Sequence, residues 1–174
     1  MTRSRPPVRP LISERRLRAR VRVLGRRIGR EYRGKELILV GVLKGSFIFM
    51  ADLAREIGIP LTCDFLRVSS YGGARTSGSV RFEFDLTQPV KGKHVVLVED
   101  IVDTGLTMEY LLENLRTRHP ASVKLCALLH KPDRAVKQIP IDYLGFTIPD
   151  LFVIGYGLDY AQRYRNLPFI GVLE

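Results

Sequence analysis

The segment Val95-Val96-Leu97-Val98-Glu99-Asp100-Ile101-Val102-Asp103-Thr104-Gly105-Leu106-Thr107-Met108 decides the fold. Its first four residues form an uninterrupted apolar run, which is typical of a parallel β-strand covered on both faces. Its last residues lead into a helical pattern that extends from Met108 to Arg118. We therefore predict a buried strand, a tight loop and a helix, which is the unit of parallel α/β sheets.

The loop between this strand and this helix is suited to a phosphate group. The first N–H groups of a helix have no partners within it, and the helix dipole places partial positive charge there. Thr104 and Thr107 add hydroxyl donors, and Gly105 lets the backbone approach a phosphate closely. The loop lacks the Gly-Lys-Ser/Thr ending of a Walker A motif. For Asp103 alone, an N-cap on an ordinary helix is the alternative interpretation.

Two adjacent carboxylates, Glu99 and Asp100, lie at the carboxyl end of the predicted strand. Ligands of open α/β sheets bind at this edge. Carboxylates placed there can hold ribose hydroxyls or a hydrated Mg²⁺ ion. Combined with the phosphate loop, they predict a phosphorylated sugar as ligand.

The remaining pattern alternates strands with helices. We predict a second helix over 47–57 and further strands over 36–43, 61–68, 80–86, 123–129, 143–146 and 152–156. Residues 71–79 are rich in Gly, Ser and Thr and lack apolar anchors, so this segment is predicted to be a mobile flap. The pattern indicates an α/β fold with a mainly parallel sheet flanked by helices, and a small hood formed by the last elements. Residues 11–174 form one domain in this prediction, after a flexible basic tail over 1–10.

Composition agrees with a single domain that has a real core, since the chain has 174 residues of which 45% are hydrophobic. Cys63 and Cys126 lie in apolar stretches without metal-ligand spacing, so both are predicted to be buried free thiols in a reducing cytoplasm. The sequence contains no run of about 18 apolar residues and no leader-like apolar region at its start, so membrane spanning and secretion are not expected.

The net charge of +10 arises from the first part of the chain. Residues 1–35 carry thirteen Lys or Arg against two Glu, whereas residues 36–174 carry fifteen against sixteen acidic residues. Leu17, Val21, Leu24 and Ile28 recur there at helical spacing, which predicts an amphipathic helix packed on the domain. Its arginines are interpreted as a solvated face. Nucleic-acid binding is the less favoured alternative, because aromatic residues other than Tyr32 do not alternate with the basic ones.

Four segments together resemble one family. The strand–loop segment is similar to the phosphoribosyl-pyrophosphate (PRPP) signature of type I phosphoribosyltransferases, and the other segments resemble the bacterial hypoxanthine (guanine) branch of that family. The similarity extends from about Leu11 to Leu173. The other segments are Leu43-Lys44-Gly45-Ser46-Phe47, Ser69-Ser70-Tyr71-Gly72 and Asp150-Leu151-Phe152-Val153-Ile154-Gly155-Tyr156-Gly157-Leu158-Asp159-Tyr160.

The resemblance implies a purine salvage enzyme. Its members transfer a ribosyl 5-phosphate group from PRPP to N9 of hypoxanthine, and also of guanine, with Mg²⁺, giving IMP or GMP and pyrophosphate. It further implies a homodimer or homotetramer, and a cis peptide bond between Leu43 and Lys44. PRPP and its phosphates are expected to bind Lys44, Gly45, Glu99, Asp100, Asp103, Thr104, Gly105, Leu106, Thr107 and Arg165, and Mg²⁺ is expected to bind Glu99, Asp100 and Asp159.

The purine-side roles also come from the resemblance. Asp103 matches the general base near N7, and Lys131 matches the lysine that donates to O6 and so favours 6-oxopurines over adenine. Phe152 matches the aromatic that stacks on the base, and Val153 and Asp159 match further purine-binding residues. Without the resemblance, Lys131 and Asp159 would be surface charges and Phe152 would belong to the core.

The flap residues Ser70 and Tyr71 match those that close over the reacting centre and exclude water. Two departures from the family, His130 before Lys131 and the pair Arg134-Ala135 after it, touch no assigned catalytic role. A transferase that prefers xanthine or guanine, and a PRPP-sensing regulator that binds nucleic acid, remain the alternative functions.

Overall fold

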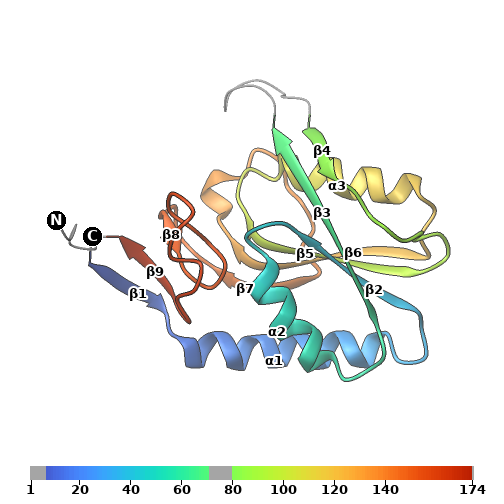
Figure 1. The fold of residues 1–174 in the computed structure, drawn as a ribbon, viewed down its shortest axis with the longest axis horizontal. Coiled ribbons are helices and arrows are strands. Elements are labelled where there is room, and N and C mark those ends of the chain that lie inside the picture. The colour runs from blue at the N-terminus through green and yellow to red at the C-terminus, as the bar shows by residue number, and fades with distance from the viewer. Residues whose placement is uncertain (1–6, 71–79, 174) are drawn as a thin grey trace.

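The computed structural model describes residues 7–70 and 80–173, and its centre is a six-stranded sheet (Figure 1). The strand order is β4-β3-β2-β5-β6-β7. All neighbouring pairs are parallel except β3 and β4. The strands are β2 (Leu37–Val42), β3 (Thr62–Ser70), β4 (Val80–Phe84), β5 (His94–Val102), β6 (Ser122–His130) and β7 (Tyr143–Thr147). The predicted mainly parallel α/β sheet is confirmed.

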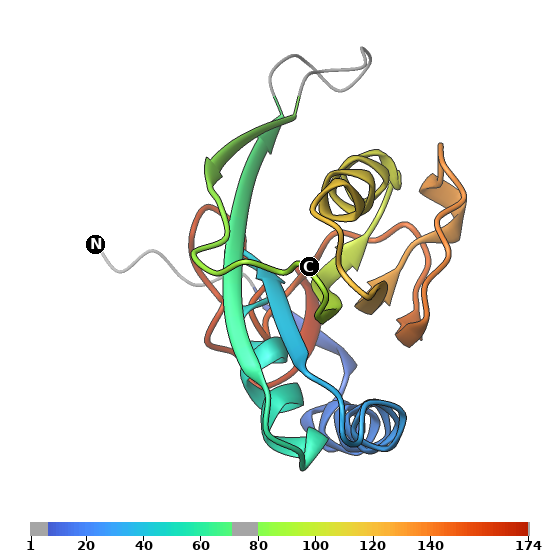
Figure 2. The same ribbon diagram turned by 90° about the vertical axis from the view of Figure 1, so that its right-hand side faces the viewer.

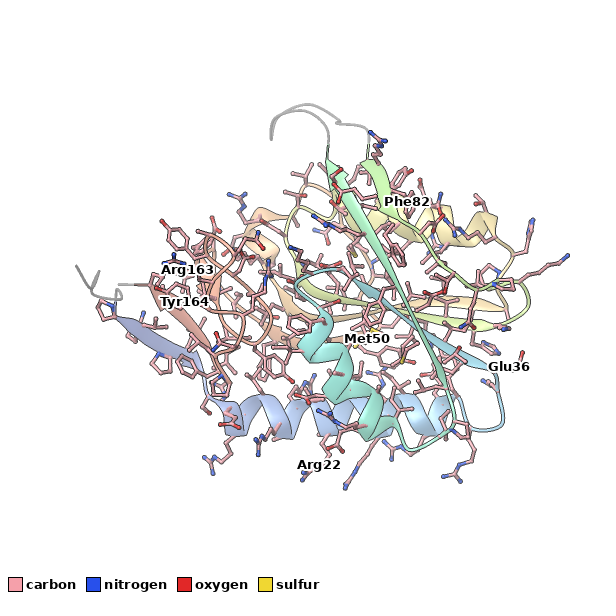
Figure 3. The ribbon with its side chains drawn as sticks, in the orientation of Figure 1. Arg22, Glu36, Met50, Phe82, Arg163 and Tyr164 are labelled. Atoms are coloured by element: carbon pink, nitrogen blue, oxygen red, sulfur yellow. The ribbon has the colours of Figure 1, made fainter. Side chains whose placement is uncertain are left out.

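Helices cover both faces of this sheet, as Figure 2 shows in the view along the sheet. One face packs on α1 (Glu14–Glu31) and α2 (Phe47–Ile57), where Met50 lies between α2 and the sheet (Figure 3). The other face packs on α3 (Leu106–Thr117) through Met108, Leu111 and Leu115. β5 lies between these two layers, which explains why its apolar run Val95–Val98 is completely buried.

The arginines of helix α1 lie in two different environments, one against the sheet and one exposed to solvent. Leu17, Val21, Leu24 and Ile28 are buried, as predicted for an amphipathic helix. Arg20 donates to the carbonyl oxygens of Leu144 (2.6 Å) and Gly145 (3.0 Å) of β7. The guanidinium groups of Arg16 and Arg27 lie over the rings of Phe146 and Tyr143. The interpretation of a solvated arginine face therefore holds only for the outer side of α1. There, Arg22 (Figure 3) is exposed, although its Nε also lies 3.7 Å from Oε1 of Glu56 in α2.

The hood is a separate antiparallel sheet of strands β1-β9-β8. It is formed by β1 (Val8–Ile12), β8 (Val153–Ile154) and β9 (Ile170–Leu173), so the two ends of the described chain lie side by side (Figure 1). The predicted flexible tail over 1–10 is wrong for Val8–Pro10, which pair with β9, while residues 1–6 lie outside the described chain.

Two other predictions need correction. Cys126 is a buried free thiol, but Cys63 is exposed, because side chains alternate along β3 and Asp64 and Leu66 take its buried side. The predicted strand over 152–156 is reduced to Val153–Ile154, and Phe152 before it is exposed. Helix α2 has the predicted bounds. Within the described residues, no helix is both long enough and apolar enough to cross a membrane.

Candidate active site

The carboxyl end of β5 opens into a small cavity of about 210 Å³. Its lining comes from the ends of β2, β3 and β5 and from the loop that begins α3. The lining includes Glu99, Asp103, Thr104, Gly105 and Thr107. Five of the residues predicted to bind the phosphorylated sugar therefore line one cavity at the edge of the sheet where ligands of α/β proteins bind.

The predicted phosphate loop directly precedes α3. Gly105 is the N-cap of this helix and has a φ of 83°, a conformation that favours glycine. A Cβ atom on Gly105 would lie 2.5 Å from the carbonyl oxygen of Lys137. The Thr104 carbonyl oxygen accepts hydrogen bonds from the backbone N–H groups of Val136 (3.0 Å) and Lys137 (2.9 Å). Segment 136–137 therefore fixes the back of the loop, while the N-terminus of α3 faces the cavity.

Glu99 is a buried acid without a hydrogen-bond partner on Oε2 among the described residues. Burial raises the pKa of its carboxyl well above 4.5, and the negative charge of Asp100 raises this pKa further. Buried polar atoms normally have a partner, so an unpaired oxygen beside a cavity needs an explanation. A donor supplied by a ligand, such as a sugar hydroxyl or a metal-bound water, would provide one.

Asp100 packs against the loop that follows β2. A Cβ atom on Gly45 would lie 1.5 Å from Asp100 Oδ2, so only glycine fits beside this carboxylate. The preceding Leu43–Lys44 peptide bond is cis, as the resemblance implied. Ser46 is buried and donates to the carbonyl oxygen of Val42 (2.7 Å). The loop that carries Lys44 and Gly45 is therefore held against the carboxyl end of β5.

A second charged group lies on the loop that follows β8. Asp159 pairs with Arg165 (2.7 Å) and accepts the backbone N–H of Gln162 (2.8 Å). The Gln162 Oε1 atom accepts from Lys44 Nζ (3.4 Å) and from Arg165 Nη2 (3.3 Å). Gln162 thus joins the two cations predicted to bind pyrophosphate, a role that sequence reasoning missed.

A third group consists of four charges in a chain. Arg134 Nε donates to Asp103 Oδ1 (3.1 Å), and Arg134 Nη1 lies 3.7 Å from Asp150 Oδ2. Lys131 Nζ lies 3.5 Å from Asp150 Oδ1. The expectation that Arg134 touches no assigned catalytic role is therefore wrong, because it binds the predicted general base. The motifs used for the prediction contained Asp150 but gave it no role.

The aromatic and backbone elements of the predicted purine site lie on the segment before and within β8. Phe152 is 59% exposed and meets Tyr160 edge-on, with ring centroids 5.9 Å apart. This exposure excludes the alternative that Phe152 is a core residue. Val153 is buried, and its backbone pairs with Val172 of β9.

The flap can be placed only in part. Ser70 is the last residue of β3, where its backbone pairs with Val80 of β4. Tyr71 lies outside the described residues.

The donor set fits Mg²⁺ bound largely through substrate. Among the described residues, no three His, Cys, Asp or Glu side chains converge on a common metal position. Mg²⁺ is usually held by one or two carboxylates together with substrate phosphates and water. The unpaired oxygen of Glu99, with Asp100 adjacent in sequence, agrees with such a partial site. The Asp159 carboxylate is already bonded to Arg165 and Gln162, so a metal there would share its oxygens.

Comparison with known proteins agrees with this geometry. Residues 13–161 match the phosphoribosyl transferase domain family. The chain is 50% identical over 170 residues to the hypoxanthine phosphoribosyltransferase of Haemophilus influenzae, covering 94% of this chain and 95% of that protein. It is 48% identical over 171 residues to the hypoxanthine-guanine phosphoribosyltransferase of Mycobacterium avium, covering 94% and 84%.

A solved structure agrees with the sequence comparison. The crystal structure of a hypoxanthine-guanine phosphoribosyltransferase from Bacillus anthracis superposes with a TM-score of 0.91 at 44% identity, covering 95% of this chain and 98% of that one. The chain therefore belongs to the phosphoribosyltransferase family, within its hypoxanthine phosphoribosyltransferase branch.

Proposed function

We propose that this protein transfers the 5-phosphoribosyl group of PRPP to N9 of hypoxanthine, and also of guanine, forming IMP or GMP and pyrophosphate in purine salvage. One observation carries the proposal. Asp103, which begins the phosphate loop, and Lys131, at the end of the neighbouring strand β6, belong to one chain of ion pairs. A purine between them would have its ring edge and its O6 within reach of both residues.

Each base-binding residue has a separate role. Asp103 is the general base that takes or stabilises the N7 proton as N9 attacks C1 of the ribose. Lys131 donates to O6, and its side chain is only 10% exposed, so water competes little for this contact. The exposed ring of Phe152 stacks on the base, and the backbone of Val153 reads its edge, with Asp159 beside it. Adenine carries an amino group at C6 and gives Lys131 no acceptor.

The PRPP-binding residues bind the phosphate, ribose and pyrophosphate groups of the substrate and form no covalent intermediate with it. The loop 103–107 binds the 5-phosphate through backbone N–H groups and the hydroxyls of Thr104 and Thr107, with Leu106 contributing its backbone. Glu99 and Asp100 accept the ribose hydroxyls. Lys44, the Gly45 backbone and Arg165 hold the departing pyrophosphate, for which a planar guanidinium is well suited.

Mg²⁺ would be held by Glu99, Asp100 and Asp159, and when bound it neutralises charge on the pyrophosphate leaving group. Ser70 and Tyr71 of the flap exclude water from the reacting centre. We further propose a homodimer or homotetramer in the cytoplasm, where the free Cys63 and Cys126 would stay reduced.

The test is nucleotide formation from PRPP with hypoxanthine, guanine, xanthine and adenine in parallel, with and without Mg²⁺. We expect metal-dependent IMP and GMP with adenine inert, and the four rates rank the bases. Faster xanthine conversion would move the assignment to a xanthine transferase. PRPP binding without nucleotide formation from any base would refute the proposed transferase activity.

A further inference from the structure

The four-charge chain Lys131–Asp150–Arg134–Asp103 links the two residues expected to contact the purine through two residues that have no assigned role. The two end members, Asp103 and Lys131, are those assigned to the base. The two middle members, Arg134 and Asp150, are both about half exposed, with side-chain exposures of 49%. An exposed pair in contact with two functional groups is placed to control where those groups point.

Each end member depends on the middle member with which it is paired. Lys131 is 8% exposed, and a cation at such a position is costly unless a carboxylate lies near it. Asp150 is that carboxylate. At the other end, the Arg134 guanidinium donates a charge-assisted hydrogen bond to Asp103, which fixes the direction of the carboxylate. Arginine is always a cation in proteins, and the hydrogen bond to Asp103, followed by the charges of Asp103 and Asp150, raises the pKa of Arg134 further.

The backbone keeps these residues in register. Lys131 immediately precedes the short 3₁₀-helix Pro132–Arg134, and the Arg134 N–H donates to the Lys131 carbonyl oxygen (3.1 Å). The bonds from Val136 and Lys137 to Thr104 join the same segment to the phosphate loop next to Asp103. Asp150 lies two residues before Phe152, on the segment expected to stack on the base. The four charges thus come from the three segments that surround the proposed purine position.

We propose that Arg134 and Asp150 are positioning residues that hold Asp103 and Lys131 in the free enzyme and release them to the purine by exchange of ion pairs. The O6 atom of an incoming 6-oxopurine replaces Asp150 as the acceptor for Lys131, and the N7 edge approaches Asp103. Arg134 and Asp150, now 3.7 Å apart, then close on each other. A base without an acceptor at C6 offers Lys131 no hydrogen bond in place of its ion pair with Asp150. The exchange therefore adds to the discrimination against adenine. The proposal rests on the transferase function proposed above.

The first test is steady-state kinetics of Asp150→Asn, Arg134→Gln and Arg134→Lys, varying hypoxanthine and PRPP separately. Asp150→Asn is expected to raise the KM for hypoxanthine roughly tenfold and to change the KM for PRPP by less than about twofold. Arg134→Gln is expected to lower kcat roughly tenfold, and Arg134→Lys to recover part of it, because it keeps the charge but loses the planar fork. The double variant Asp150→Asn/Arg134→Gln is expected to lower kcat/KM for hypoxanthine by less than the product of the two single-variant effects.

The matched control is Glu109→Gln. It removes the Glu109–Lys137 ion pair (3.0 Å), whose side-chain exposures of 35% and 49% are close to those of Asp103 and Arg134. This pair also ties the segment after the 3₁₀-helix to α3, but among the described residues no ion pair or hydrogen bond joins it to Asp103 or Lys131. Kinetics of Glu109→Gln near wild type support the proposal. Losses equal to those of Asp150→Asn would show that only loop anchoring matters and would overturn it.

The second test does not depend on turnover. The side-chain Nε–H resonance of Arg134, assigned by NMR through its loss in Arg134→Lys, is expected to shift in Asp103→Asn and on addition of IMP. An unchanged resonance in both cases overturns the positioning role. A wild-type protein without transferase activity refutes the proposed function, and the NMR comparison of wild type with Asp103→Asn still decides whether Arg134 holds Asp103.

Discussion

The substitution Glu99→Gln is expected to stabilise the free protein while weakening its use of PRPP. Glu99 is buried and its Oε2 has no hydrogen-bond partner among the described residues. Leaving a buried polar group unpaired costs about 1–3 kcal/mol, and more when the group is charged. The amide has the same shape but no charge. We therefore expect a gain of about 1–3 kcal/mol near neutral pH, which corresponds to a rise in Tm of roughly 2–10 °C for a domain of this size.

The pH dependence of this gain has a definite sign. Burial, and then the charge of Asp100, raise the pKa of Glu99 in the folded state well above 4.5. Above about pH 4.5, Glu99 loses its proton in the unfolded chain but keeps it in the folded protein. The folded state therefore binds more protons than the unfolded state. Its contribution to stability therefore falls as the pH rises from about 4.5 through the raised pKa. Glutamine does not titrate, so the advantage of Glu99→Gln should be small near pH 5 and larger near about pH 8.

Urea unfolding of both proteins across this pH range measures the effect. Asp64→Asn is the matched control, since Asp64 is also buried but accepts N–H groups from Phe65 (2.8 Å), Thr87 (2.8 Å) and Gln88 (3.1 Å). An amide there turns a donor toward these N–H groups, so Asp64→Asn should destabilise by about 1–3 kcal/mol. A difference between Glu99→Gln and wild type that is independent of pH, or destabilisation by Glu99→Gln, would refute the reasoning.

Three further substitutions test other parts of the molecule. Asp103→Asn should lower kcat by about 10²–10⁴-fold with little change in PRPP affinity, measured by steady-state kinetics and calorimetry, because it removes the general base but keeps the phosphate loop. Gly45→Ala should abolish PRPP binding in calorimetry, since its Cβ would lie 1.5 Å from Asp100 Oδ2; normal affinity would show that this contact is not needed. Leu17→Ala should destabilise by about 2–5 kcal/mol in urea unfolding, because Leu17 is fully buried between α1 and the sheet.

Local patterns allowed much of the fold to be predicted. The apolar run before Glu99 and Asp100, followed by a Gly-containing loop, identified the strand, the loop and the helix that form the cavity. Helix α2 could be bounded because Gly58, in the left-handed conformation, ends it. These signals lie within about a dozen residues of each other in the sequence, which is why they can be recognised without the fold.

Long-range pairings were not predictable. β1 contains Pro10, which lacks an N–H group and weakens any strand signal, and its partner β9 lies at the other end of the chain. Arg134 and Asp103 are 31 positions apart, and Lys131 and Asp150 are 19 apart. No spacing rule relates such positions, so sequence alone gave Arg134 and Asp150 no role in the site.

The pairing of β1 with β9, and of β9 with β8, sets an order in which the protein can mature during translation. The sugar-phosphate side is formed by β2, β3, β5 and the start of α3, which leave the ribosome well before the C-terminal strands. Val153 in β8 is held only after Val172 has been synthesised and has paired with it. A nascent chain stalled before β9 should therefore bind a sugar phosphate but no purine, so nucleobase recognition is the last capability that this polypeptide acquires.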